Sequence, residues 1–169
     1  MKLRLLLLEE CNRRCKGCCN KDWDLSALPT VTDFRNYELV MLTGGEPMLY
    51  PGLIASAVSN IRAQTTAPVV LYTAKVDDAE AALNVLNSID GMTVTLHARK
   101  DIAAFLAFDA AMVDAGIENK KLRLNVFAGV SKYFKPTADV LSRWKLKGNI
   151  VWIKDCPLPT EEVLARYTA

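Results

Sequence analysis

Four of the five cysteines in this 169-residue chain lie within nine consecutive positions, 11 to 19. Cys11, Cys15 and Cys18 have the spacing C-x3-C-x2-C, and Cys19 follows directly. Cysteine thiolates hold iron–sulfur clusters, which usually have four such ligands. Three cysteines on one loop therefore predict a cluster in which one iron has no protein ligand and can bind another molecule. Because the cysteines are clustered and odd in number, they indicate a metal site rather than a disulfide framework.

A second segment that could do chemistry is Gly44-Gly45-Glu46-Pro47, which follows an apolar run. Glycine has no Cβ, so the backbone at Gly44 and Gly45 can approach a ligand closely. Backbone groups there and the Glu46 carboxylate could accept charge-assisted hydrogen bonds from an ammonium group, and Pro47 would fix the turn. An ordinary strand-to-helix loop has the same composition, so the segment becomes informative only together with the cysteines.

The two motifs together resemble the radical S-adenosylmethionine (radical SAM) superfamily. In that family a C-x3-C-x2-C loop follows the first strand, and a Gly-Gly-Glu-Pro segment at the end of the second strand binds the methionine part of SAM. The resemblance implies that Cys11, Cys15 and Cys18 each bind one iron of a 4Fe-4S cluster, whose fourth iron chelates SAM. One electron would then cleave SAM to methionine and a 5′-deoxyadenosyl radical, which abstracts a hydrogen from the substrate.

These residues need a scaffold that brings the ends of two strands together. Short apolar runs alternate with segments of helical periodicity, which is typical of βαβ units and a parallel sheet. Strands are expected at residues 3–8, 38–43, 69–73, 92–97, 122–127 and 150–153. Helices are expected at residues 51–64, 77–88, 101–115 and 136 to 144 or 146, with a last short helix from Thr160.

Six such units are too few for an eight-stranded barrel. The prediction is therefore one α/β domain over residues 1–169, an open partial (β/α)6 barrel with a six-stranded parallel sheet. This is also the fold that the resemblance implies.

Three more polar residues, Thr95, His97 and Asn125, fall at or near expected strand ends. Sites on parallel α/β sheets lie at these ends. By resemblance, Thr95 would contact the SAM carboxylate or ribose, and Asn125 would contact the ribose. His97 stands where the family often has aspartate, although a lone histidine is more often structural.

Cys19 occupies the position where relatives usually place an aromatic residue against the adenine of SAM. The resemblance therefore implies a backbone contact with adenine at Cys19, with Trp23 or Tyr72 as alternative stacking surfaces. Cys156, just past the last expected strand, is expected to be a small buried residue.

The cysteine loop also bears on the substrate. Cys15-Lys16-Gly17-Cys18-Cys19-Asn20, with Trp23 soon after, resembles a Cys-x-Gly-Cys-Tyr-Asn segment in activases of anaerobic ribonucleotide reductase. Those short chains make a glycyl radical on a partner protein, but their closing Gly-Ser-Ser-Asn-Gln-type pattern is missing here. The alternative is an enzyme that modifies a small molecule or peptide, similar to 7-carboxy-7-deazaguanine synthase. Either function implies an electron donor such as flavodoxin or ferredoxin.

A function of another class is a zinc or structural metal module without catalysis. Cys11, Cys15, Cys18 and Cys19 offer four thiolates, enough for a tetrahedral site. Adjacent Cys18 and Cys19 would be poorly placed to bind one ion together, and the Gly-Gly-Glu-Pro turn would have no role. The radical SAM interpretation is therefore favoured.

Composition excludes some other classes. A net charge of +2 is weak and gives no signal of nucleic-acid binding. The apolar run near the amino terminus is far shorter than the roughly 20 residues of a membrane helix, and no cleavage site of a signal peptide follows it. The expectation is a cytoplasmic protein that does not bind membranes.

Overall fold

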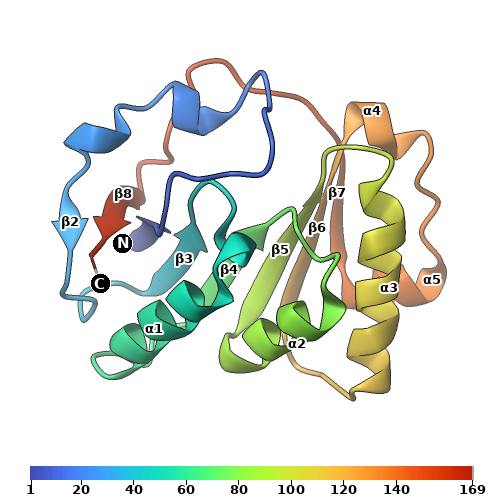
Figure 1. Ribbon diagram of the computed structural model, residues 1–169, viewed down its shortest axis with the longest axis horizontal. Coiled ribbons are helices and arrows are strands. Elements are labelled where there is room, and N and C mark those ends of the chain that lie inside the picture. Colours follow the sequence, from blue (N-terminus) through green and yellow to red (C-terminus); the bar gives the residue numbers. More distant parts are fainter. Residues whose placement is uncertain (169) are drawn as a thin grey trace. The chain divides into compact units, whose positions relative to one another are not determined.

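The computed structural model describes residues 1–168. Its strands are β1 (Lys2–Leu6), β2 (Thr30–Val31), β3 (Leu39–Thr43), β4 (Val69–Thr73), β5 (Gly91–Leu96), β6 (Lys121–Phe127), β7 (Lys145–Ile150) and β8 (Glu162–Tyr167). Its α-helices are α1 (Pro51–Arg62), α2 (Ala79–Ser88), α3 (Asp101–Asp114), α4 (Ala128–Ser131) and α5 (Ala138–Arg143). Three 3-10 turns are η1 (Cys19–Lys21), η2 (Leu25–Ala27) and η3 (Pro47–Leu49). The strands form an open α/β sheet in the order β2-β8-β1-β3-β4-β5-β6-β7 (Figure 1).

The chain divides into two compact units, of which the first comprises residues 1–71 and the residues from 152 onward. In this unit β1 lies between β3 and β8, and both pairings are parallel. Leu3 and Leu5 of β1 are fully buried, as expected for a strand in the middle of a parallel sheet. Helix α1 begins at Pro51, whose missing N–H costs nothing at a first helical position.

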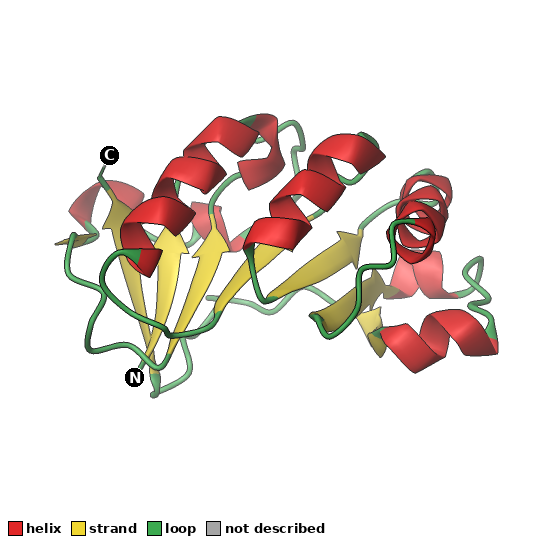
Figure 2. Cartoon of the chain, turned by 90° about the horizontal axis from the view of Figure 1, so that it is seen from below, coloured by secondary structure: helices red, strands yellow, loops and turns green. Residues whose placement is uncertain are grey.

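The second unit comprises residues 72–151 and contains β5, β6 and β7, which pair in parallel. Along β6 the burial alternates, so Leu122, Leu124 and Val126 are buried while Lys121 and Arg123 are exposed. Since successive strand residues point to opposite faces, one face belongs to the core and the other is open. Helices α2 and α3 lie side by side in this unit (Figure 2).

Five predicted strands and three predicted helices are confirmed, with ends within two residues of those observed. The expected number of strands was wrong, because the sheet has eight strands and not six. The short helix expected from Thr160 is instead β8. Glu161 and Glu162 resemble the first turn of a helix, but they form ion pairs with Lys2 and Arg4 across to β1.

The last predicted strand and helix were also misplaced. The strand expected at 150–153 is β7, at Lys145–Ile150. Val151, Trp152 and Ile153 follow it as exposed residues outside any strand. An edge strand that is exposed at five of its six positions has little apolar pattern, so hydrophobic periodicity favours the more apolar segment that follows it. The helix expected from residue 136 is shorter, because α5 ends at Arg143. In residues 1–168 no helix is both long and apolar enough to cross a membrane.

The buried carboxylate of Asp109 joins two helices of the second unit. Asp109 is 4% exposed, and it accepts hydrogen bonds from Arg143 Nε at 3.0 Å and Nη2 at 2.6 Å. It also accepts one from Trp144 Nε1 at 2.8 Å. The Trp144 ring packs edge-on against Phe105, with ring centroids 5.0 Å apart. Asp109 therefore connects α3 to the end of α5.

We expect Asp109→Ala to lower the free energy of unfolding by about 2 kcal/mol, because it leaves three N–H donors, on the side chains of Arg143 and Trp144, without their acceptor. Asp114→Ala, on the same helix but exposed, is the matched control and should change stability by less than about 0.5 kcal/mol. Urea unfolding followed by circular dichroism measures both. Equal stability of the two variants would contradict this role for Asp109.

Candidate metal and cofactor site

The two motifs follow neighbouring strands. Strands β1 and β3 are paired in parallel with Leu6 opposite Thr43, so the segments that follow the two strands leave the sheet at the same edge. The hydrogen bonds between them continue past the strand ends. Leu7 N donates to Thr43 O at 2.9 Å, and Gly45 N donates to Leu8 O at 2.8 Å. The segment that leads to Cys11 is thus held against the Gly-Gly turn.

The two glycines are needed for this close approach. A Cβ on Gly45 would lie 1.9 Å from Glu10 O, and a Cβ on Gly44 would lie 2.6 Å from Leu8 O. Gly44 also has a φ of +154°, which L side chains rarely adopt. The sequence predicted glycines that admit a ligand, and the structure shows that they admit the backbone of residues 8–10.

The three cysteines of the C-x3-C-x2-C motif are free thiols on the loop after β1. Cys11 is exposed, while Cys15 and Cys18 are half-buried. Burial raises the pKa of the Cys15 thiol, and the neighbouring thiols of Cys18 and Cys11 raise it further, while Arg13 and Lys21 act in the opposite direction. The sulfurs of Cys11 and Cys18 therefore lie near enough to that of Cys15 to disfavour its ionised form. In residues 1–168 no group of three or more His, Cys, Asp or Glu side chains is already arranged around one metal position. The thiols would have to turn toward a common centre to bind one.

Several contacts that the sequence analysis missed hold this loop in place. Asn20 Nδ2 donates to Gly44 O at 3.0 Å, which joins the end of the cysteine segment directly to the glycine turn. Lys21 Nζ donates to Cys15 O at 2.6 Å. The side chain of Trp152 lies over Gly17, where a Cβ would come within 2.5 Å of Trp152 Cγ. Gly17 and Asn20 belong to the cysteine motif, so the sequence could indicate their importance. No sequence pattern near the loop indicates a contact with Trp152.

A disulfide joins Cys19 to Cys156 across 137 residues, with 5.4 Å between their Cα atoms. Trp23 Nε1 donates to Cys156 O at 3.2 Å and supports the same connection. The preference for a metal site over disulfides was therefore wrong for these two cysteines. Cys156 is a buried residue as predicted, at 7% exposure, but the disulfide itself was not foreseen. Sequence spacing carries no information about so distant a pair.

We expect Cys156→Ser to lower the free energy of unfolding by about 2–4 kcal/mol, because a crosslink that closes a long loop restricts the unfolded chain. Wild-type protein treated with a reducing agent is the matched control and should lose the same amount. The variant should not respond to the reducing agent. Thermal unfolding with and without reductant measures this, and equal stability of wild type and variant under oxidising conditions would contradict it.

Glu46 is buried, at 2% exposure. Its Oε1 accepts a hydrogen bond from Met48 N at 3.0 Å, so Glu46 caps the 3-10 turn η3, in which Pro47 takes the first position. Its own backbone N donates to Glu10 O at 2.8 Å. Glu46 is therefore held from both sides, beside the segment that enters the cysteine loop.

No protein-family model and no curated protein matches the chain.

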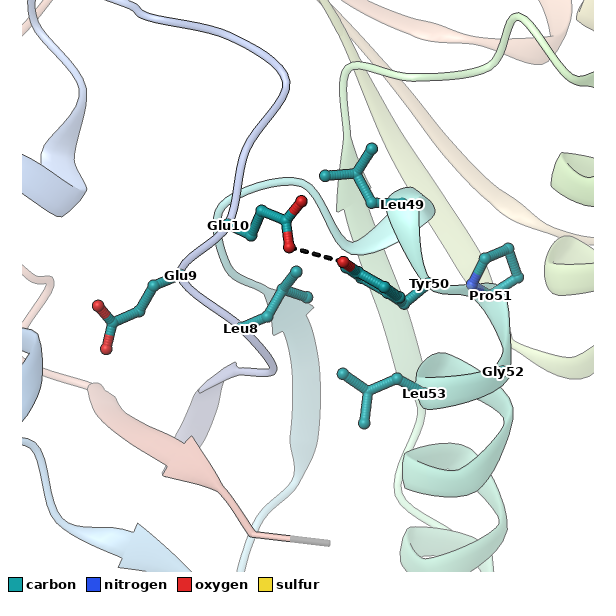
Figure 3. Close-up of a pocket in the computed structure, with 8 residues that line it drawn as sticks. All are labelled: Leu8, Glu9, Glu10, Leu49, Tyr50, Pro51, Gly52 and Leu53. Atoms are coloured by element: carbon teal, nitrogen blue, oxygen red, sulfur yellow. Dashed lines mark hydrogen bonds between the residues drawn. The ribbon is translucent and has the colours of Figure 1, made fainter.

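A shallow pocket of about 650 Å³ opens beside the turn, lined by Leu8, Glu9, Glu10, Leu49, Tyr50, Pro51, Gly52 and Leu53 (Figure 3). The Tyr50 hydroxyl donates to Glu10 Oε2 at 2.6 Å. This hydrogen bond raises the pKa of Tyr50, as does the charge of Glu10. The contact joins the residue before Cys11 to the start of α1, so the pocket wall helps to position the loop.

The remaining predicted site residues belong to the second unit. Thr95 and Asn125 are opposite each other in the pairing of β5 with β6. His97 lies just past β5, where its ring packs against Phe127 with 4.6 Å between centroids. Its backbone N donates to Asp101 Oδ2 at 2.9 Å. The structure thus gathers these three residues in one cluster at the carboxyl ends of β5 and β6.

Proposed function

We propose that the chain is a radical SAM enzyme, in which the cysteine loop holds a 4Fe-4S cluster and the Gly-Gly-Glu-Pro turn forms part of the SAM site. The observation that supports this most strongly is the pairing of the two loops. Hydrogen bonds from Gly45 N to Leu8 O and from Glu46 N to Glu10 O hold the turn directly beside the start of the cysteine loop. Both glycines are needed for this close approach, because a Cβ on either would meet the backbone of residues 8–10.

The donor set fits such a cluster. Cys11, Cys15 and Cys18 are free, and burial together with the neighbouring thiols of Cys18 and Cys11 raises the pKa of Cys15. A cationic metal centre would offset that effect, so binding should release protons from the loop. When bound, the cluster would supply the electron that splits SAM reductively.

The residues of the turn would bind the amino acid part of SAM. We expect backbone groups at the turn and the Glu46 carboxylate to accept hydrogen bonds from the SAM ammonium group. Glu46 is buried, and charge interactions are stronger away from water. For Cys19 only the backbone remains for an adenine contact, because its sulfur is in the disulfide. Thr95, His97 and Asn125 keep their proposed roles near the ribose and carboxylate, and the partial-barrel form of the sheet is part of the same proposal.

The disulfide also weakens the zinc alternative. A four-thiolate zinc site needs Cys19 together with Cys11, Cys15 and Cys18, but Cys19 is bonded to Cys156. Three thiols then remain on the loop, which is the number that a cluster with one open iron requires.

Anaerobically reconstituted and reduced protein is expected to convert SAM to 5′-deoxyadenosine and methionine, slowly and without any substrate. The Cys15→Ala variant, treated in the same way, is the control and should form neither product. Chromatography of the nucleoside products measures this. Methylthioadenosine as the main product, or no turnover by a protein that holds its full iron content, would contradict the proposal.

The radical SAM proposal leaves two substrate classes, a partner protein and a small molecule or peptide. A glycyl-radical partner protein would show a glycyl radical by electron paramagnetic resonance after incubation with enzyme, SAM and a reduced flavodoxin or ferredoxin. A small-molecule or peptide substrate would instead raise the rate of SAM cleavage without any radical on a partner protein.

A further inference from the structure

The open face of β5, β6 and β7 carries basic side chains that the proposed function does not use. The three strands contain Lys121, Arg123, Lys145 and Lys147 and no aspartate or glutamate. All four side chains belong to exposed residues. The whole chain has a net charge of only +2, so a local excess of four positive charges is a specific feature of these strands.

The four cations share one face of the sheet. Arg123 is opposite Lys145, and Asn125 is opposite Lys147, in the parallel pairing of β6 with β7. Lys121 lies two residues before Arg123 and therefore points the same way, while Leu124 points into the core. Neighbouring strands are about 4.8 Å apart and alternate residues about 6.6 Å apart. The four charges thus occupy an area the size of one small molecule.

This arrangement is unfavourable without a counter-charge. Like charges directly opposite each other on paired strands destabilise a sheet, and Arg123 and Lys145 are such a pair. Among residues 1–168 no acidic side chain forms an ion pair with any of the four. Lysines on an edge strand can prevent it from pairing with another chain, which would explain the two lysines of β7. That reason does not apply to Arg123, because β6 lies inside the sheet.

Toward the carboxyl ends of the strands, the same face continues into the residues that the proposed function assigns to SAM. Asn125 and Thr95 are half-buried and opposite each other, one step nearer the carboxyl ends of the strands. Phe127 and His97, which pack together, are the next residues on this face. A guanidinium can bind a phosphate or carboxylate through two hydrogen bonds, and the neighbouring lysines could bind a second anionic group.

We propose that this face binds a small polyanion, a metabolite that bears at least two phosphate or carboxylate groups. The limited area favours such a molecule over nucleic acid or an acidic protein. The inference does not depend on the iron–sulfur cluster, since the four basic residues all belong to the second unit and none of them is part of the proposed SAM site. It can therefore be tested on protein without iron, and its failure would leave the radical SAM proposal unaffected.

Isothermal titration calorimetry with inorganic pyrophosphate, and separately with citrate, tests the inference on the full chain. We expect saturable binding of at least one of them that weakens as salt is raised. Arg123→Gln and Lys145→Gln should each weaken that binding by about tenfold or more, as for loss of a charge-assisted hydrogen bond. Lys135→Gln, which removes an exposed lysine of the same unit outside the strands, should leave affinity within about twofold.

Three results would overturn the proposal. One is the absence of saturable binding of both anions. Another is an equal loss of affinity in Lys135→Gln and Arg123→Gln, which would indicate a general charge effect. The last is preferential binding of a single-stranded oligonucleotide in competition with pyrophosphate, which would assign the face to an extended polymer. The unfolding temperature of each variant without ligand checks that all are folded, as expected for substitutions at exposed positions.

Discussion

Replacing Cys11, Cys15 or Cys18 by alanine is expected to remove most of the roughly four irons that one chain would bind. Each thiolate would hold a different iron, so the two remaining thiolates could not retain the cluster. Cys19→Ala and Cys156→Ala should keep the full iron content, because the two sulfurs are bonded to each other and not to the proposed metal centre. This gives three variants that lose the cluster and two matched variants that keep it.

Iron and sulfide analysis after anaerobic reconstitution measures the outcome, together with the visible absorbance of the cluster. Folding is checked by circular dichroism, and no gross change is expected from the variants of the three free thiols, which are half-buried or exposed. The Cys19 and Cys156 variants should show the lower stability expected for loss of the disulfide. Loss of iron in Cys19→Ala would show that the ligand assignment is shifted by one residue. Zinc bound in equal amount to all five variants would contradict the iron–sulfur proposal altogether.

The parts of the fold that could be predicted are those in which local pattern and tertiary role agree. Strands such as β1 and β3 are continuous apolar runs, because a central parallel strand is buried on both faces. Strand β8 was missed because its sequence begins like a helix. What makes it a strand is its place between β1 and β2, with Glu162 paired to Arg4. The partner residue Arg4 lies about 160 residues away in the chain, so the local sequence does not indicate this pairing.

The candidate site divides in the same way. The C-x3-C-x2-C motif and the Gly-Gly turn could be identified by spacing alone, and their adjacency followed from the order of two strands. The contacts that hold the loop could not be identified, because the bond of Cys19 to Cys156 and the packing of Trp152 on Gly17 join distant segments. Both contacts come from residues 151–160, where the prediction of secondary structure also failed. Because a strand was predicted at residues 150–153, Trp152 and Cys156 were not expected to contact the cysteine loop.

Gly45 is the residue for which this structural role can be tested most directly. We expect Gly45→Ala to lower the free energy of unfolding by about 4 kcal/mol or more, beyond the 1–3 kcal/mol of ordinary overpacking. The reason is that the new Cβ would meet Glu10 O at 1.9 Å and Glu10 C at 2.4 Å. These are backbone atoms, which cannot turn aside as a flexible side chain could. Relief of the clash would require the hydrogen bonds of Gly45 and Glu46 to Leu8 and Glu10 to break.

Gly52→Ala provides the matched control. Gly52 lies only seven residues further on, in the first turn of α1, and a Cβ there would meet nothing within 4 Å. Because alanine is a better helix former than glycine, this variant should be unchanged or more stable by up to about 1 kcal/mol. Denaturant unfolding of the two variants measures the difference, and iron content after reconstitution reports on the loop. A Gly45→Ala protein that is as stable as Gly52→Ala would show that the turn does not hold the cysteine loop. If Gly45→Ala folds but retains little iron, the pairing of the two loops would be required for the metal site itself.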